Sequence, residues 1–538
     1  MIDNPRDRKV AVMAKYFNVI GVCRPSEHYM VSLDGRLAEI RKMIDRKYYF
    51  AMNRGRQYGK TTTLAALKDF LQEDFIVASL DFQFLSQADF ETERIFSAAF
   101  ARRFAAVLRR VSEAAGEALD RIKEYGDEGC ALSVLFEGLS EFCGSAPKPV
   151  VLLIDEVDSA SNNQVFLDFL ALLRGYYLQR EDFPTFQSVI LAGVYDIRNL
   201  KQKVRPDSEH KHNSPWNIAA AFDVNMDLEV DGIAGMLAEY EADYHTGMDV
   251  RRMAQLLYEE TCGYPFLVSR LCQLMDEQIP GSGEFPDRQA AWSREGLLAA
   301  EKILLMEKNT LFDSLTNKLT DYPKLQELLY SILFRGESVV YNPDNSAIDI
   351  ACMFGFVKRE NGTMQVANRI FETRLYNLFL SEEEVSNRTF SAAVADRNQF
   401  IQNGILNMEL LLEKFVVHWG DLYHSADEKF IEENGRKFFL LYLKPIINGV
   451  GNYYIEARTR DRGRTDVIVD YRGRQYIIEI KIWRGEEYNR RGEEQLVSYL
   501  ESYHARKGYL LSFNFNKNKI PGVKEISWDG KVIFEAIV

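Results

Sequence analysis

The sequence predicts an α/β protein with a parallel sheet in its N-terminal part and a second, smaller α/β domain at its end. Three stretches carry this prediction, residues 48–71, 149–158 and 464–481. The first is an apolar strand, a turn with glycines and an amphipathic helix, and the second is an apolar run typical of a strand covered on both faces. The third alternates about a tight turn, as a hairpin does.

Length and composition are those of a soluble protein with several domains. A prior of about 100 to 200 residues per domain divides the 538 residues into three or four units. With 46% hydrophobic and 27% charged residues and no bilayer-length apolar run, we expect no membrane association. The charged start, MIDNPRDRKVAVMAKYF, lacks the apolar core of a signal peptide, which predicts a cytoplasmic protein.

Charge and cysteine usage exclude two further classes. A net charge of -13 argues against a surface built for constitutive nucleic-acid binding, so any basic surface must be local. The six cysteines include no CxxC pair, which argues against a disulfide framework and against a zinc site.

Residues 48–71 predict a phosphate-binding loop, YYFAMNRGRQYGKTTTLAALKDFL. Backbone N–H groups at the start of the helix would face an anion, Lys60 would reach the outer phosphates, and the Thr61 hydroxyl would ligate Mg²⁺. Gly59 and Thr62 complete the expected cofactor-binding residues together with Gly55.

The loop departs from the usual pattern at one position. The pattern has a glycine five positions before the glycine of GK, and this chain has Arg54 there, followed by Gly55. We expect the neighbouring glycine to relieve the turn.

Residues 149–158, PVVLLIDEVD, end a buried strand in carboxylates. In nucleoside triphosphatases the first acid, here Asp155, holds the Mg²⁺ shell, and the next, here Glu156, polarises the attacking water. A further strand, SVILAGVYDIRNL, would bring Asp196 and Arg198 to the same sheet edge as candidate phosphate sensors; ordinary surface residues are an equal alternative.

Other segments of this part receive structural interpretations. His28 and Tyr29 favour packing over a contact with a nucleotide base, and His210 and His212 are expected to be exposed because no third metal ligand is suitably spaced. Residues 226–280 are mainly helical, with a GYP turn at 263–265 that starts a new helix and predicts a small lid.

Five segments together resemble the AAA-like ATP-binding domain of a bacterial family related to STAND and archaeal-type ATPases. The resemblance spans about residues 18–280 and rests on RGRQYGKTTTL, PVVLLIDEVD, SVILAGVYDIRNL, SPWNIAAAF and CGYPFLVSRLC, in that order. It implies a P-loop parallel-sheet ATPase that binds ATP, with a helical lid that senses it. The family often has an RQxGKT core, which RQYGKT matches.

A coupling segment follows. Residues 354–368, FGFVKRENGTMQVAN, predict a hairpin with Asn361 and Gly362 at its turn, and helices on both sides indicate a winged-helix-like fold. Coupling is favoured over DNA binding because the flanks are acidic.

In the predicted hairpin RTDVIVDYRGRQYIIEIK, residue spacing alone puts candidate catalytic side chains on one face. If Arg472 and Gly473 form the turn, counting outward sets Asp466 opposite Glu479. Lys481 then projects from the same face, while Ile478 and Ile480 pack into the core. Two carboxylates so close favour a divalent cation or a proton between them. A Mg²⁺ there would activate water while Lys481 stabilises charge on a phosphate.

The same hairpin resembles the PD-(D/E)XK nuclease superfamily, with Asp466 as the D and Glu479 to Lys481 as the ExK. GEEQLVSYLESY is similar to the QxxxY motif of RecB-type nucleases through Gln495 and Tyr499. Thr465 stands where the superfamily has proline. The resemblance implies a restriction-endonuclease-like α/β domain, with Glu479 and Asp466 binding Mg²⁺ or Mn²⁺ and Gln495 orienting the site or the strand.

Two features of this region stay open or local. The leading helix would add one metal-binding acid, Glu432, with Glu433 and Glu456 as the alternatives. A basic collar suited to a nucleic-acid backbone comprises Arg458, Arg460, Arg462, Arg464, Arg484, Arg490 and Arg491.

We therefore expect four parts: an ATPase domain at 1–225, a lid at 226–280, a coupler at 281–400 and a nuclease domain at 401–538. The predicted function is an ATP-controlled, metal-dependent nuclease acting on nucleic acid, with DNA as the default. The analogy with AAA-like proteins that carry a PD-(D/E)XK domain at their C-terminus implies a role in defence against phage or mobile DNA. The alternative is a non-catalytic ATP-dependent switch or DNA-binding regulator; a helicase is disfavoured because no second ATPase lobe appears. Homo-oligomerisation and the trigger stay open.

Overall fold

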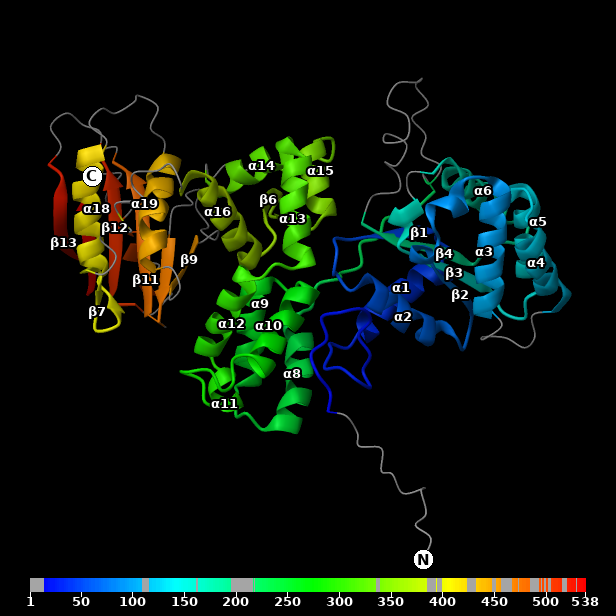
Figure 1. Ribbon diagram of the computed structural model, residues 1–538, viewed down its shortest axis with the longest axis horizontal. Helices are drawn as coiled ribbons and strands as arrows, with labels where there is room; N and C mark the ends of the chain where they lie inside the picture. The colour runs from blue at the N-terminus through cyan, green and yellow to red at the C-terminus, as the bar shows by residue number, and fades with distance from the viewer. Residues whose placement is uncertain are drawn as a thin grey trace, which may run out of the picture. The chain divides into compact units, whose positions relative to one another are not determined.

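The computed structural model describes most of the chain as two compact units. The described residues are 14–108, 116–160, 163–194, 216, 218–334, 339–384, 393, 399–422, 432–447, 451–455, 467–472, 474–483, 493–494, 496–497, 500–501, 505–514, 520–528 and 530–538. Unit 1 comprises Met1–Tyr258, Gly263–Gln273 and Met353–Gly355, and unit 2 comprises Glu259–Cys262, Leu274–Cys352 and Phe356–Val538. Figure 1 shows the elements of both.

Unit 1 is built on a parallel four-stranded sheet. Its strands lie in the order β1 (Phe50–Asn53), β4 (Ser188–Gly193), β3 (Val150–Asp155) and β2 (Ile76–Asp81). Every residue of β3 and β4 is buried. The three apolar strands predicted before and after the loop helix are therefore confirmed, and both faces of the sheet are covered.

Helices cover the two faces of this sheet (Figure 1). One face packs through Val77, Val151 and Leu153 against α1 (Asp34–Asp45) and α2 (Lys60–Leu71). The other packs through Ala78 and Leu152 against a larger helical layer. That layer consists of α3 (Glu93–Leu108), α4 (Gly116–Glu128), α5 (Leu132–Ser145) and α6 (Gln164–Leu178), with the 3₁₀ turns η1 (Phe82–Phe84), η2 (Gln87–Phe90) and η3 (Val157–Ala160) at the strand ends.

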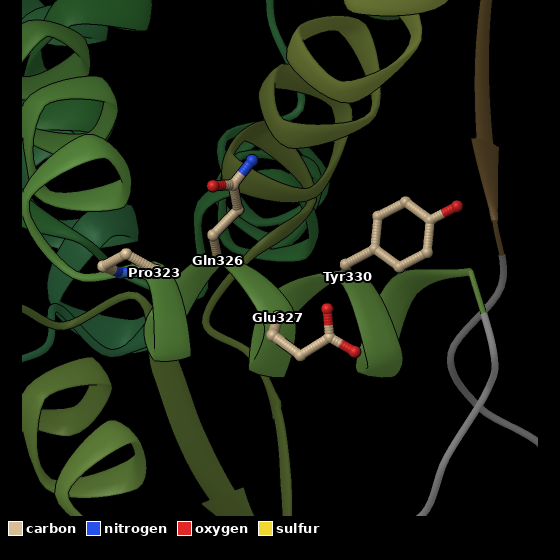
Figure 2. A pocket seen from close by; sticks show the side chains of 4 residues that line it. All are labelled: Pro323, Gln326, Glu327 and Tyr330. Atoms are coloured by element: carbon tan, nitrogen blue, oxygen red, sulfur yellow. The ribbon is translucent and has the colours of Figure 1, made fainter.

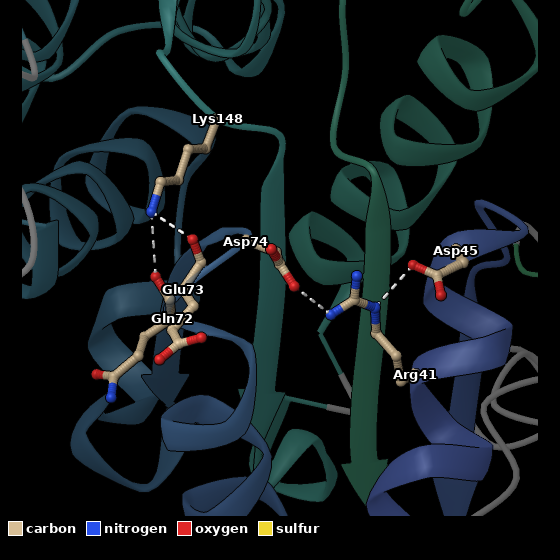
Figure 3. Close-up of polar contacts among 6 residues, drawn as sticks. All are labelled: Arg41, Asp45, Gln72, Glu73, Asp74 and Lys148. Atoms are coloured by element: carbon tan, nitrogen blue, oxygen red, sulfur yellow. Dashed lines mark hydrogen bonds and ion pairs between the residues drawn. The ribbon is translucent and has the colours of Figure 1, made fainter.

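Surface ion pairs and a hydrogen bond join α1, the segment before β2 and the segment before β3 (Figure 3). Arg41 on α1 bonds Asp45 at 2.8 Å and Asp74 at 2.7 Å, and its guanidinium lies 4.7 Å from the Phe75 ring centroid. Lys148, just before β3, donates to the Glu73 carbonyl at 2.6 Å. These contacts hold α1, the segment before β2 and the start of β3 in register.

The remaining helices of unit 1 are α8 (Val230–Tyr244), most of α9 (Val250–Thr261) and most of α10 (Pro265–Glu277). Gly263, in the predicted GYP turn, has a φ of 75°. A Cβ there would lie 2.2 Å from the Leu228 carbonyl oxygen, so only glycine fits between α9 and α10.

Unit 2 begins with helices around a small hairpin. The turn of this hairpin has positive φ at both Asn361 (50°) and Gly362 (81°), which confirms the predicted Asn-Gly turn. The elements are α11 (Arg288–Ala291), α12 (Arg294–Met306), α13 (Thr310–Asp321), α14 (Pro323–Leu333), α15 (Ser346–Met353), β5 (Val357–Glu360), β6 (Thr363–Val366) and α16 (Arg369–Glu384).

A six-stranded mixed sheet ends unit 2. The strand order is β13-β14-β12-β11-β10-β9, with β11, β12 and β14 parallel to one another. The strands are β9 (Gly451–Ile455), β10 (Val467–Tyr471), β11 (Arg474–Ile482), β12 (Lys507–Phe513), β13 (Gly522–Trp528) and β14 (Lys531–Ile537); the two-stranded β7 (Ile401–Gln402) and β8 (Ile405–Leu406) precede α18 (Met408–Leu422) and α19 (Glu432–Ile447).

The two faces of this sheet have different partners. On one face Phe513 packs against Phe415 and Trp419 of α18. On the other, an apolar cluster joins Ile468, Ile477, Leu510 and Ile533 to Leu496, Val497 and Leu500. Any polar side chain on this second face therefore lies beside an apolar cluster.

Candidate functional site

The phosphate-binding loop lies where the sequence predicts it, between β1 and α2. Gly59 has a φ of 77° and precedes the first residue of α2. Lys60 is buried, and its ammonium group donates to the carbonyls of Arg54 (3.0 Å) and Gly55 (2.9 Å). The lysine thus lies inside the loop whose backbone it would help to hold around a phosphate.

Arg54 has a structural reason to replace the usual glycine. Its guanidinium lies 5.4 Å from the Phe222 ring centroid and donates to the carbonyls of Phe222 (3.4 Å) and Val224 (3.3 Å). Gly55 is not in the left-handed region; it is needed for space, because a Cβ there would lie 2.5 Å from the Phe354 carbonyl oxygen. The neighbouring glycine therefore relieves crowding rather than backbone strain.

Carboxylates after β3 face this loop. Asp155 is buried and accepts hydrogen bonds from the Thr61 hydroxyl and, at 2.9 Å, from the Glu156 amide. Burial raises the pKa of Asp155, and these two bonds lower it in part. A carboxylate and a hydroxyl in contact are oxygen donors of the kind Mg²⁺ takes in nucleotide sites, so Asp155 and Thr61 fit that ion.

Glu156 and Lys60 complete the charge pattern. Glu156 is exposed and has a φ of 53°, a conformation that non-glycine residues adopt rarely and that is found often at functional sites. Partial desolvation of its carboxylate raises the pKa of Glu156, and the nearby Asp155 raises it further. Burial lowers the pKa of Lys60, whereas Asp158, Glu156 and Asp155 raise it.

The end of β4 lies between the loop and the acidic strand. The Arg54 amide donates to the Gly193 carbonyl at 3.3 Å, and Asp158 accepts from the Val194 amide at 2.6 Å. The Thr62 hydroxyl instead accepts a hydrogen bond from the Cys23 amide at 3.1 Å. The loop, β3 and β4 therefore meet at one edge of the sheet.

An aromatic clamp on the loop was not predicted from the sequence. The Tyr58 hydroxyl donates to Asp227 and the Tyr264 hydroxyl donates to the Arg56 carbonyl, each at 2.5 Å. The two rings meet at 4.5 Å between centroids, at an angle of 65°. The tyrosine of the GYP turn was the available signal, but nothing in the sequence indicated its partner.

The first segment packs as predicted. His28 and Tyr29 are buried; the His28 ring lies 4.6 Å from that of Tyr16, and the Tyr29 hydroxyl donates to Asp243 at 2.7 Å. The structure gives these residues packing roles.

In the C-terminal sheet, the hairpin has the predicted register. Tyr471 pairs with Arg474 and Val467 pairs with Ile478, as the predicted register requires, while Asp466 lies outside the described residues. Glu479 and Lys481 are buried, and the lysine Nζ lies 2.7 Å from the Glu479 Oε1. Ile478 and Ile480 are buried as expected, but so is the opposite face of β11.

Three further polar residues share that face, and sequence reasoning missed them. Ser512 is the neighbour of Lys481 on β12, and Leu510 separates Glu479 from Glu535 of β14. The Ser512 hydroxyl donates to Glu535 Oε1 at 2.9 Å, and Lys524 Nζ lies 2.8 Å from Glu535 Oε2. A lone carboxylate in the apolar run VIFEAIV was the only signal.

Several predicted residues lie outside the described part of the chain. These are Asp196, Arg198, His210, His212, Glu456, Asp466, Gln495 and Tyr499, the collar arginines and the side chains of Glu432 and Glu433. Among the residues that the structure describes, no three His, Cys, Asp or Glu side chains form a group that could hold a metal ion. Glu479 is thus the single described carboxylate of the expected nuclease metal set.

The structure also has a surface pocket in unit 2. It is lined by Pro323, Gln326, Glu327 and Tyr330 of α14 (Figure 2). It contains none of the predicted site residues. In the described portion, no helix has the length and apolar character needed to cross a bilayer.

Comparisons with known proteins give structural similarities without a family. The chain matches no protein-family model and no curated protein. It is similar to a Walker-type ATPase of Pyrococcus abyssi, with 12% identity and a TM-score of 0.46 over 67% of this chain and 99% of that one. It is also similar to the ORC1 protein of Aeropyrum pernix in complex with DNA (12% identity, TM-score 0.29, 66% and 94% of the two chains) and to a RuvB variant of Thermotoga maritima (12%, 0.31, 62% and 92%). With TM-scores below 0.5, these similarities do not define a family for the chain.

Proposed function

We propose that unit 1 binds and hydrolyses ATP. The observation that carries this proposal is the placement of three groups: Lys60 buried inside the loop, Thr61 next to it at the start of α2, and Asp155 buried at the end of β3. A P-loop enzyme needs these three groups together: an ammonium for the outer phosphates and two oxygen donors for the metal ion.

Each residue has a distinct role in this proposal. Lys60 holds the phosphates, while Thr61 and Asp155 hold Mg²⁺, which neutralises phosphate charge when bound. Glu156 orients the attacking water, and its raised pKa brings it closer to the range of a general base. Gly55 and Gly59 let the loop backbone approach the phosphates.

Two substitutions separate binding from hydrolysis. Lys60→Ala should abolish ATP binding in calorimetry, whereas Glu156→Gln should bind ATP and lose hydrolysis by about 100-fold or more. Lys68→Ala is the matched control because Lys68 lies on the same helix, α2, in its last turn. Retention of ATP binding and hydrolysis by Lys60→Ala would refute the proposal.

We further propose that the C-terminal sheet is a metal-dependent phosphodiesterase. The buried contact between Lys481 and Glu479, on a hairpin whose described pairs have the predicted register, supports it. A lysine beside a metal-binding carboxylate can stabilise the negative charge that develops on a phosphate while the phosphodiester bond breaks. Asp466 and Glu432 would complete the metal ligands, and Gln495 would orient the site.

The substrate in this proposal is nucleic acid, with DNA as the default, and ATP bound to unit 1 controls cleavage. A role in defence against phage or mobile DNA follows only from the resemblance of the sequence. The competing proposal is a non-catalytic switch in which ATP binding drives partner binding and the C-terminal sheet only grips DNA.

A cleavage assay distinguishes the two. We expect the full chain with Mg²⁺ or Mn²⁺ to cleave at least one of linear, circular or single-stranded DNA, with a rate that depends on ATP and on Lys60. Glu479→Gln and Lys481→Ala should lose cleavage, whereas Lys507→Ala, on the opposite face of the sheet, should keep it. If every DNA and RNA form stays intact with the wild type, the sheet is not a nuclease.

A further inference from the structure

A row of buried polar side chains crosses three parallel strands of the C-terminal sheet. Glu479 and Lys481 lie on β11, Ser512 on β12 and Glu535 on β14, and all four are at most 7% exposed. The strand registers place them on one face, because Lys481 is paired with Ser512 and Leu510 with both Glu479 and Glu535.

Apolar side chains lie directly beside the row on this face, which also carries Asp470, Gln475 and Lys524. Ile468, Ile477, Leu510 and Ile533 form a hydrophobic cluster on it. An ionised carboxylate loses much of its hydration when it is buried, and a hydrophobic residue at Glu535 would avoid that cost. A buried charge retained in such a place suggests a function beyond packing.

The hydrogen bonds of the row have a direction. Lys481 bonds Glu479 at 2.7 Å, and the Ser512 hydroxyl gives its hydrogen to Glu535 at 2.9 Å. With its hydrogen committed to Glu535, the Ser512 oxygen has only acceptor lone pairs to offer its other neighbours. Its neighbour across the strands is Lys481, a group with donors only.

We propose that Glu535 is a positioning residue of the nuclease site, acting on Lys481 through Ser512. Glu479 would hold the divalent cation of that site. Ser512, whose own hydrogen is donated to Glu535, would then accept a hydrogen from the Lys481 ammonium group and keep it in position to stabilise charge on a phosphate. This inference rests on the proposed nuclease function, and Lys524 serves only to balance the charge of Glu535.

Kinetics of four single variants and one double variant test the role of each bond. Ser512→Ala and Glu535→Leu should lower kcat by about 10- to 100-fold with KM changed less than twofold. Glu535→Gln keeps an oxygen that accepts from Ser512 and should stay within about threefold of the wild type. Lys524→Ala should also stay near the wild type. The double variant Ser512→Ala/Glu535→Leu should lose no more than either single variant.

A purely structural role gives another pattern. Activity would then fall in proportion to stability, and Lys524→Ala and Glu535→Gln would lose as much as Glu535→Leu. Equal loss in all four variants, or additive loss in the double variant, would overturn the inference.

A chemical readout decides the inference even if the wild type cleaves nothing, an outcome that refutes the nuclease itself. In the Glu479→Ala variant, the carboxylate that Lys481 contacts is absent, and no cation is needed to separate the two groups. Its acetylation by an N-hydroxysuccinimide ester, followed by mass spectrometry, should stay within about threefold of the wild type and rise about tenfold in Glu479→Ala/Ser512→Ala. Lys531, which donates to the Ala505 carbonyl in the same domain, is the internal reference for folding. Equal labelling of Lys481 in both variants, with Lys531 unchanged, would overturn the role of Ser512. Should Glu479→Ala unfold, the same comparison is made between wild type and Ser512→Ala with Mn²⁺ present.

Discussion

The hydroxyl of Tyr264 donates a hydrogen bond to the backbone carbonyl of Arg56, and so connects the residue just before α10 to the phosphate-binding loop. The contact is buried on the tyrosine side, and the ring of Tyr58 packs against that of Tyr264. A change in the loop backbone at Arg56 is therefore felt directly at the start of a helix of the expected lid.

Tyr264→Phe should weaken ATP binding because it removes one donor and leaves the ring in place. A hydrogen bond of this kind contributes about 0.5–1.5 kcal/mol, which corresponds to a loss of affinity of roughly 2- to 12-fold. Calorimetric titration with ATP measures it, and Tyr176→Phe, on α6, is the control. Unchanged affinity would show that the bond does not organise the loop.

Gly263→Ala should destabilise unit 1 by at least about 2 kcal/mol, because the residue has a left-handed φ and its new Cβ would meet the Leu228 carbonyl at 2.2 Å. The midpoint of urea unfolding measures the loss. Gly235→Ala on α8 is the matched control: nothing lies within 4 Å of its Cβ position, so helix propensity should make it neutral or stabilising. Similar midpoints for the two variants would contradict this account of the turn.

Arg54→Gly restores the usual loop glycine, yet we expect it to impair the protein. It removes the contact with the Phe222 ring and three hydrogen bonds and adds backbone freedom, a loss of about 1–3 kcal/mol in total. ATP affinity should not rise. Arg56→Gly, at an exposed position of the same loop, should lose less stability. If the Arg54→Gly variant bound ATP more tightly and were as stable as the wild type, the arginine would have no structural role in the loop.

Glu301→Gln should stabilise unit 2 increasingly as the pH rises. Burial raises the pKa of Glu301 well above its ordinary value, and Glu260 raises it further. Between the ordinary and the raised pKa, the folded chain keeps a proton that the unfolded chain releases, so the stability of the wild type falls with rising pH. Glutamine does not titrate, and we expect its advantage to reach about 1 kcal/mol or more at pH 8.

Urea unfolding from pH 5 to pH 8 measures this difference. Glu295→Gln, at an exposed position of the same helix α12, should show no comparable trend. A stability difference between Glu301→Gln and wild type that is constant with pH would contradict the role assigned to burial.

Local patterns predicted the elements of both centres. The loop, the acidic end of β3 and the Asn361-Gly362 turn follow from backbone rules that act over a few residues. The register of β10 and β11 followed from a two-residue turn, because each pair outward is determined by the one before it.

Contacts between distant segments could not be predicted in this way. The place of β4 between β1 and β3 depends on packing of both sheet faces. Arg54 meets Phe222, and Tyr264 meets Arg56, only after the helices of unit 1 have packed. The sequence alone gives no reason for a carboxylate at Glu535. The reason appears only in the fold, where Ser512 of β12 donates a hydrogen bond to it.

The strand order of unit 1 also has a kinetic consequence. Phe50 of β1 pairs with Ile190 of β4, whereas β2 pairs with β3 and β3 with β4. Loop closure over such a separation is slow, so the first strand to leave the ribosome waits for the fourth before it can dock. A nascent chain that stops before Ser188 therefore carries the lysine and the acidic strand but not the strand that joins them, and ATP can favour folding only once β4 has been made.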